Sequence, residues 1–555
     1  MVCSDGTRLA TRIWSPPGEG PWPVLLMRQP YGRAIASTVT YAHPRWYAGH
    51  GFLVAVQDVR GRGDSEGHFR GFASEAADGA TAVRWARNLP GSNGRLGTYG
   101  FSYQGLTQLL NSGGSGECHT ADDPLPDCLV PAMAGLDERR HWAAEGGAHW
   151  WGLGLAWALQ LAAEGCRRRG DGDGWRAIRR SLTAATYSED GAALLDQLDP
   201  DGMGLAWLRR DPADIASWRR HDVVPELLRR PMLLIGGWHD PHLAGVLDLW
   251  ERSQAAGGKP GLVVGPWTHL GWDGGLDALQ LAFFRRHLLG PGVAMPVAPG
   301  DPATLLAGPL AAAAEGAVAL AGEGETGWFA PQPSTPGNAP LAAPRWSLRS
   351  DGRAAVRPDE GQLLEAPLAA SKASAGCVML VHDPWRPVPS RGGHLGLPAG
   401  MVDRADLDAR TDVACFTTAP QASELLLLGR PWLRLTVGAD QPGFDLCLAL
   451  ALLPAGGGAV SQISTGFARC LGPAALRLEL RQVELQPLAV RLRPGDRLRL
   501  SIAPAAWPAV AVNPGDGSPP WGGSGPQHRV VSLELDLQNA ILQIDPLLGG
   551  GAGAE

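Results

Sequence analysis

A serine flanked by glycines constrains the fold of this chain more than any other feature. The stretch GTYGFSYQGLTQLLNSG places Ser102 where an apolar strand pattern gives way to a helical one, with Gly100 and Gly105 beside it. Small neighbours permit so sharp a turn, which exposes the hydroxyl at the carboxyl end of a sheet and leaves the backbone N–H of Tyr103 free to bind an oxyanion. The usual spacing is G-x-S-x-G. Here Gln104 precedes the second glycine, so the spacing alone leaves a plain strand-to-helix turn open.

The first 135 residues alternate between strand and helix patterns. A helix is predicted over residues 75–88, with Ser74 as its N-cap, and another over residues 106–110. Apolar runs predict strands at residues 24–28, 52–57, 95–99 and 129–133. This order predicts a parallel sheet with crossover helices, which binds ligands beyond the carboxyl ends of its strands. Ser102 lies at such an end.

The same pattern returns after residue 230 and supplies two more polar side chains. Strands predicted at residues 232–236 and 262–265 are followed by Asp240 and His269. A serine, an acid and a histidine in this order, each beyond a strand, match the requirement of an α/β-hydrolase. The histidine takes the proton of the serine hydroxyl, and the acid fixes the histidine tautomer and stabilises its cation. The sequence therefore predicts a catalytic triad of Ser102, Asp240 and His269.

Three parts of the chain differ in pattern. Residues 1–134 and 230–340 form the predicted α/β-hydrolase catalytic domain. Residues 135–229 carry tryptophan-rich helical patterns and are predicted to be an inserted helical cap. Period-two runs separated by Gly and Pro turns predict a jelly-roll β-sandwich over residues 341–555. Its strands are expected at residues 425–428, 432–437, 446–452, 476–485, 496–502 and 530–537.

Several details of these parts bear on the site. Trp142 and Trp150 of the cap are candidates for substrate binding, with packing in an ordinary helical core as the alternative. The last helix of the hydrolase domain is predicted over residues 276–289, where it closes the sheet, and a Gly/Ala/Pro-rich connector follows over residues 290–344. The β domain contains no cluster of acids, histidines or cysteines, so a structural role is expected for it.

Composition and charge exclude several classes of function. The 555 residues have a formal net charge of −7, and no Lys/Arg run is long enough for nucleic-acid binding. The run at residues 167–169 is interpreted as a solvated helix face. Eight cysteines without zinc-like spacing are expected to be isolated thiols. Because neither a leader-like segment nor a good membrane span is evident, a cytoplasmic protein that does not contact a membrane is expected.

Two further motifs are similar to cofactor or metal sites, but neither has the pattern that such a site requires. The segment DVRGRGDSEG at residues 58–67 is glycine-rich, but its spacing differs from that of a dinucleotide-binding turn and it does not lead into a helix. His239, Asp240 and His242 are potential metal ligands, yet Pro241 breaks any helical spacing and no third cluster is evident. These residues are interpreted as a loop around the candidate acid. Neither a metal nor a cofactor is expected.

Several motifs together resemble the cocaine esterase and Xaa-Pro dipeptidyl-peptidase family of serine hydrolases. They are GFSYQG, GGWHD and GPWTH at the triad positions, DGTRLATRIW, MRQPYGR and DVRGRGDSEG in the first 70 residues, and DPWRPVPSRGG in the β domain. In that family the second glycine of the turn around the serine also comes one place late, as Gly105 does here. The resemblance implies an α/β-hydrolase fold with a C-terminal jelly roll, and it implies that the Tyr31 hydroxyl is an oxyanion donor beside the Tyr103 N–H. It implies no substrate-binding residues, because the cap and the connector do not align.

The predicted function is that of a serine hydrolase acting on esters, or amides, of small organic acids through an acyl-enzyme. The alternatives are an Xaa-Pro dipeptidyl-peptidase and a non-catalytic binding protein on a hydrolase scaffold. The presence of all four residues needed for the chemistry, which are Ser102, Asp240, His269 and Tyr31, argues against a non-catalytic protein. A small-molecule ester or amide is the expected partner, nucleic acid is not expected, and a homo-oligomer is left open.

Overall fold

The N-terminal half of the protein is built on one mostly parallel sheet. The computed structural model describes residues 1–34, 41–110, 125–272, 275–289, 301–324, 327–331, 343–366 and 376–548. The sheet has eight strands in the order β1-β3-β2-β4-β5-β8-β9-β10, and only β1 runs antiparallel to its neighbour among these described strands. The strands are β1 (Thr11–Trp14), β2 (Trp22–Gln29), β3 (Leu53–Asp58), β4 (Ser92–Phe101), β5 (Cys128–Ala132), β8 (Leu233–His239), β9 (Gly261–Thr268) and β10 (Val318–Leu320).

Helices cover both faces of this sheet, because successive side chains of each strand point to opposite sides. On β2, Leu25 packs into one helical layer and Leu26 into the other. The first layer contains α1 (Pro44–Gly49) and α10 (Leu276–Leu288). The second contains α2 (Glu75–Arg87), α3 (Tyr103–Leu109) and α9 (Leu243–Ala255). The carboxyl ends of the parallel strands therefore form one edge at which polar loops meet.

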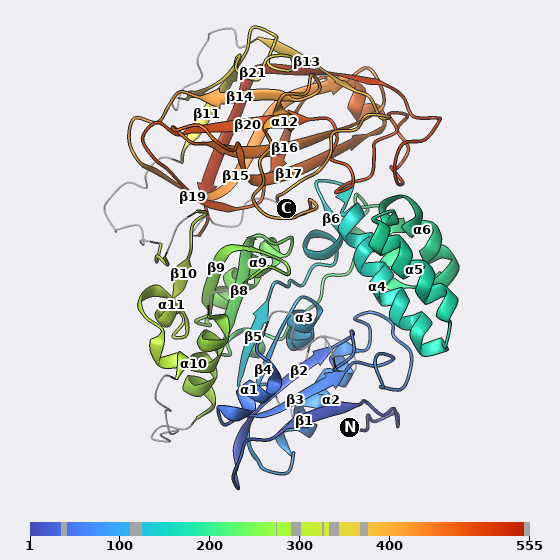
Figure 1. The fold of residues 1–555 in the computed structure, drawn as a ribbon, viewed down its shortest axis with the longest axis vertical. Helices are drawn as coiled ribbons and strands as arrows, with labels where there is room; N and C mark the ends of the chain where they lie inside the picture. Colours follow the sequence, from blue (N-terminus) through green and yellow to red (C-terminus); the bar gives the residue numbers. More distant parts are fainter. Residues whose placement is uncertain are drawn as a thin grey trace.

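Between β5 and β8 the chain leaves the sheet and forms the cap. Its helices pack around a core of their own that includes Leu155 and Leu159. Figure 1 shows this bundle, in teal, beside the sheet and next to the β domain. The elements of the cap region are η3 (Arg139–Ala143), β6 (Ala144–Glu145), β7 (Ala148–His149), α4 (Trp151–Arg169), α5 (Gly172–Ala184), α6 (Tyr187–Leu198), α7 (Met203–Arg209), η4 (Ile215–Ser217) and α8 (Pro225–Leu228).

The C-terminal part is a β-sandwich with a large apolar core, drawn at the top of Figure 1. The two strands predicted at residues 425–428 and 432–437 are parts of one 15-residue strand, β15. This strand pairs with β19 along its first part and with β21 on both sides of Pro431. Within the run predicted at 476–485, residues 479–484 form the strand β18, and residue 476 is the last of the 3-10 turn η6 (Gly472–Leu476). The strands are β11 (Arg345–Arg349), β12 (Gly361–Glu365), β13 (Cys377–His382), β14 (Ala414–Thr418), β15 (Leu425–Ala439), β16 (Gly443–Leu453), β17 (Ser461–Leu471), β18 (Glu479–Glu484), β19 (Leu488–Leu492), β20 (Arg497–Ala503) and β21 (Val531–Pro546), with the short helix α12 (Ala405–Asp408) before β14.

Other local predictions also need correction. Ser74 occupies the N-cap position of α2, but its side chain makes no capping hydrogen bond. Helix α3 begins directly after Ser102 rather than at residue 106, and the predicted stop at residue 111 lies outside the described residues. Helix α10 is not the last element of the hydrolase domain, because residues 318–320 of the expected connector form the strand β10, which pairs with β9. The elements η5 (Pro302–Leu305) and α11 (Gly308–Ala313) come before β10. In the described part of the chain no helix is long and apolar enough to cross a membrane.

Candidate active site

Ser102 forms the whole turn between β4 and α3. Its backbone has φ 58° and ψ −127°, a conformation that costs free energy for a residue with a side chain. A Cβ atom at Gly100 would lie 2.4 Å from the Cβ of Gln104, and one at Gly105 would lie 2.7 Å from the carbonyl oxygen of Ala132 on β5. The late glycine is therefore required where α3 passes close to the neighbouring strand. As the first residue of α3, Tyr103 has an N–H without a partner inside the helix.

The candidate acid and histidine lie on the next two strands and contact each other. Asp240 follows β8 and is fully buried, and His269 follows β9. The Nδ1 atom of His269 lies 2.6 Å from Oδ2 of Asp240, while Oδ1 accepts a hydrogen bond of 2.9 Å from the backbone N–H of His242. Because a carboxylate only accepts, Nδ1 carries the hydrogen and Nε2 is left as the basic nitrogen. The ring of His269 also lies 5.5 Å from that of Phe101, the residue before Ser102.

The phenol of Tyr31 lies beside Ser102. Its oxygen accepts a hydrogen bond of 3.0 Å from the indole Nε1 of Trp157 on the cap helix α4. Burial raises the pKa of Tyr31, and hydrogen bonds with Trp157 and Ser102 offset part of that effect. The phenol is therefore a neutral hydrogen-bond donor at physiological pH, which suits an oxyanion site. Trp157 was not among the predicted site residues, since its tryptophan neighbours on the cap share the same helical pattern.

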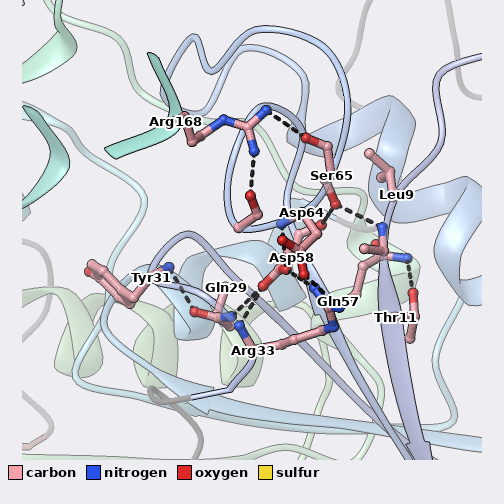
Figure 2. Close-up of polar contacts among 12 residues, drawn as sticks. Leu9, Thr11, Gln29, Tyr31, Arg33, Gln57, Asp58, Asp64, Ser65 and Arg168 are labelled. Atoms are coloured by element: carbon pink, nitrogen blue, oxygen red, sulfur yellow. Dashed lines mark hydrogen bonds and ion pairs between the residues drawn. The ribbon is translucent and has the colours of Figure 1, made fainter. Parts of the chain in front are cut away.

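A buried carboxylate at the end of β3 holds the loop that carries Tyr31, as Figure 2 shows. The backbone N–H of Tyr31 donates to Oε1 of Gln29 at 2.7 Å, and Nε2 of Gln29 donates to Oδ1 of Asp58 at 2.9 Å. The backbone and the guanidinium of Arg33 donate to the same carboxylate. Asp58 has no exposed surface. The motif DVRGRGDSEG thus begins with a residue that positions the candidate oxyanion donor.

His242 connects the triad to the two tryptophans predicted to bind substrate. Its ring lies 4.8 Å from that of His269, 4.5 Å from Trp142 and 5.8 Å from Trp150. Its Nδ1–H donates to the carbonyl oxygen of His141 at 2.6 Å, and burial lowers the pKa of His242 to about 4. The ring is therefore neutral at physiological pH and places no positive charge beside His269. Sequence reasoning interpreted His242 only as a loop residue, although its position two residues after Asp240 was a usable clue.

The two predicted tryptophans are almost completely buried. The indole of Trp142 donates to the carbonyl oxygen of Gly135 at 2.8 Å and packs on Phe72. Trp150 belongs to a cluster formed mainly by the β domain, whereas the adjacent Trp151 belongs to the cap core. Neither Trp142 nor Trp150 is on the wall of the large cavity between the cap and the loop after β3. A contact of either with substrate stays a prediction.

The β domain reaches the candidate acid, which refines the expectation that this domain has a structural role. The side chain of Gln486 donates a hydrogen bond of 2.6 Å to the backbone carbonyl of Asp240. Gln486 is itself fixed, because its N–H donates to Thr465 and its carbonyl accepts from Ser464. The fold and the residues at this sheet edge define a capped α/β-hydrolase with a C-terminal β-sandwich.

Comparison with known proteins agrees with this class. Residues 5–271 match the family model of the X-Pro dipeptidyl-peptidase (S15 family), and residues 317–534 match the X-Pro dipeptidyl-peptidase C-terminal non-catalytic domain. The cocaine esterase of Rhodococcus sp. (strain MB1 Bresler) is 26% identical over 92% of this chain and 91% of its own. The chain therefore belongs to the serine hydrolases of the S15 and cocaine-esterase type.

Two solved structures support the whole-chain fold. An aminopeptidase from the marine sediment archaeon Thaumarchaeota archaeon is 20% identical with a TM-score of 0.68, covering 98% of this chain and 95% of its own. An α-amino acid ester hydrolase is 19% identical with a TM-score of 0.67 and the same coverage. At these identities the similarity shows the fold alone.

Proposed function

We propose that the protein hydrolyses carboxylic esters of small organic acids, with Ser102 as the nucleophile. The observation that carries this proposal is the 2.6 Å pair of His269 and Asp240 at the same sheet edge as the strained Ser102. The Tyr31 phenol, which lies close enough to Ser102 for the two to interact, adds a neutral donor where negative charge would develop.

In the proposed reaction, Nε2 of His269 removes the hydroxyl proton of Ser102 as Oγ attacks the ester carbonyl. The tetrahedral oxyanion accepts hydrogen bonds from the Tyr31 hydroxyl and the Tyr103 N–H. His269 then gives the proton to the leaving alcohol, which departs and leaves the acyl group on Ser102. A water molecule, deprotonated by the same nitrogen, attacks the acyl-enzyme and releases the acid. Asp240 holds the histidine tautomer throughout.

Removal of Xaa-Pro dipeptides is the second candidate, since the matched family model is named for that activity. It requires a binding site for a free α-ammonium group, whose desolvation is costly without carboxylates. Several cap carboxylates have other partners. Glu138 accepts from Trp207 and contacts His221, Glu145 contacts His394, and Asp137 accepts from the backbone N–H of residues 139 and 140. These contacts favour esters over peptides with a free amino terminus.

Two measurements test the proposal. A fluorophosphonate should label Ser102 alone, because only an activated serine attacks phosphorus quickly, and tryptic mass spectrometry locates the adduct. Ser102→Ala is the control. A panel of 4-nitrophenyl esters beside Ala-Pro and Gly-Pro anilides then ranks the substrates, and we expect esters of aromatic or short apolar acids to exceed the anilides at least about tenfold in kcat/KM. Labelling elsewhere, or none on folded protein, would refute the assignment of Ser102. A preference for anilides that is lost on acetylating the amine would reverse the substrate class.

A further inference from the structure

A cavity of about 1020 Å³ lies between the cap and the loop after β3. One wall comes from the motif DVRGRGDSEG and the residues that follow it, including Arg62 and Phe72, and the other from cap residues such as Leu161 and Trp207. Arginines outnumber carboxylates on its walls by six to three: Arg62, Arg70, Arg168, Arg169, Arg210 and Arg219 against Glu138, Asp199 and Asp201. The cavity therefore favours a negatively charged ligand.

Arg62 is the buried cation of this cavity, with only 4% of its surface exposed. Its Nη1 donates to the carbonyl oxygen of Leu161 at 2.7 Å, and its guanidinium carbon lies 3.8 Å from the ring centroid of Phe69. Its Nε has no hydrogen-bond partner, and no ion pair of Arg62 occurs within the described residues. Burial lowers the pKa of Arg62 to about 10, so the group remains charged at neutral pH. A buried cation without a counterion is costly, which points to an anionic ligand.

The carboxylates on the cavity wall do not supply that counterion. Glu138 is engaged by Trp207 and His221. Asp199 is half-buried and lies near enough for its charge to act on Arg62, but the two form no ion pair in the described structure, and Asp201 is exposed. The positive charge of Arg62 is therefore available to a bound molecule.

Side chains of the cap connect the cavity wall to the candidate active site. Leu161 lies one turn of α4 beyond Trp157, on the same helix face, and Trp157 donates to the Tyr31 phenol. The rings of Trp157 and Trp207 are 5.7 Å apart, and the charge of Arg62 acts on Tyr31. The loop that carries Arg62 is fastened to α4, because Arg168 donates to the carbonyl oxygens of Gly63 and Ser65 (Figure 2). This contact also corrects the interpretation of residues 167–169 as a merely solvated face.

We propose that Arg62 binds a carboxylate carried by the substrate, so that the enzyme prefers esters with a second, anionic group. The inference rests on the proposed ester hydrolysis at Ser102. A planar carboxylate suits this guanidinium, because Nη1 is already occupied by Leu161 and Nη2 makes no hydrogen bond within the described residues. The anionic group could belong to the acyl part or to the leaving alcohol, and the two arms of the test distinguish these sources.

The test compares each anionic ester with its neutral twin. For the acyl side the pair is mono-4-nitrophenyl adipate and 4-nitrophenyl methyl adipate. For the leaving side it is 4-butyryloxybenzoate and its methyl ester. In one arm at least, kcat/KM of the anionic ester should exceed that of its twin by about tenfold or more, and Arg62→Gln should lower this ratio by about tenfold to a hundredfold. Arg62→Lys should restore part of the ratio, and Asp199→Asn should raise it, because it removes a competing negative charge.

Arg349→Gln, which removes the same charge from an exposed site in the β domain, is the matched control and should leave the ratio unchanged. Ratios near one in both arms, or a ratio that does not respond to Arg62→Gln, would overturn the carboxylate site while leaving ester hydrolysis intact. No hydrolysis of any of the four esters would instead refute the proposed function. If Arg62→Gln does not fold, the response of Asp199→Asn and competitive inhibition of the wild type by adipate, measured against dimethyl adipate, decide the question. Inhibition by both compounds alike would contradict the proposal.

Discussion

The indole N–H of Trp157 donates a 3.0 Å hydrogen bond to the phenol oxygen of Tyr31, and this contact joins the cap to the hydrolase sheet. Because the oxygen of Tyr31 accepts from Trp157, the phenol hydrogen is free to point toward the neighbouring Ser102. A donor held in this way needs little reorganisation when negative charge forms beside it. The cap thus contributes to the chemistry we propose as well as to one wall of the cavity beside the loop after β3.

Tyr31→Phe should lower kcat by about 10²–10³, equivalent to about 2.7–4 kcal/mol, because one oxyanion donor is lost. Steady-state hydrolysis of 4-nitrophenyl butyrate measures the effect. Tyr187→Phe, which removes the hydroxyl of a tyrosine that packs in the cap core, is the matched control and should leave kcat within twofold. A loss below tenfold in the Tyr31 variant would remove this residue from the mechanism.

Trp157→Phe should have a smaller effect of the same kind. A smaller aromatic ring remains, but the N–H that orients the Tyr31 hydroxyl is removed, and one hydrogen bond of about 1 kcal/mol corresponds to roughly a fivefold fall in kcat. In the double variant with Tyr31→Phe this fall should disappear, since there is no hydroxyl left to orient. An unchanged fivefold fall in that background would show that Trp157 acts by another route.

Asp240→Asn should lower kcat by up to about 10⁴ at neutral pH, because the amide no longer enforces the tautomer of His269 that leaves Nε2 basic. The double variant with Ser102→Ala should then be no slower than Ser102→Ala alone, as expected of residues that act as a unit. Additive losses in this cycle would mean that Asp240 is not the triad acid.

Gln486→Leu should reduce both stability and turnover, because the buried carbonyl of Asp240 loses its donor from the β domain. The expected loss of unfolding free energy is about 1–3 kcal/mol. Thermal denaturation and kcat are measured together. Gln543→Leu is the control, since Gln543 donates to Asp545 within the β domain, away from the triad, and should leave kcat unchanged. Wild-type turnover in the Gln486 variant would show that the link between the domains is only structural.

Acid should destabilise the protein through its buried histidines. Burial lowers the pKa of His141 to about 3 and that of His149 and His242 to about 4, whereas an unfolded histidine titrates near 6.5. The unfolded chain therefore binds more protons between these values, and stability present above pH 6.5 is lost as the pH falls toward 4.

His242→Asn retains a donor for the carbonyl of His141 and removes one titrating group. It should flatten the dependence of unfolding free energy on pH between about 6.5 and 4 by up to about 1.4 kcal/mol per pH unit. Urea denaturation at several pH values measures the slope. Equal slopes for the variant and the wild type would contradict a neutral, buried His242.

Several features of the fold and site could be predicted because they are local. The apolar runs at residues 24–28 and 262–265 lie within β2 and β9, and the run at 52–57 matches β3 to within one residue, since a strand buried on both faces is mostly apolar. The turn at Ser102 is also local, because a positive φ between a strand and a helix needs small neighbours on either side. The proximity of His269 to Asp240 followed from topology, because parallel strands present their carboxyl ends at one edge.

Other relationships could be decided only by the tertiary structure. Gln486 lies 246 residues from Asp240, and Trp157 lies 126 residues from Tyr31, so no local period or motif marks either pair. β10 was missed because three residues at the sheet edge carry too little pattern, and their pairing with β9 supplies the order. Arg62 looks in the sequence like one of several arginines in a glycine-rich loop. Its charge becomes distinctive only when the cap closes over it without providing a counterion, because the cost of burying a charge depends on what surrounds it in three dimensions.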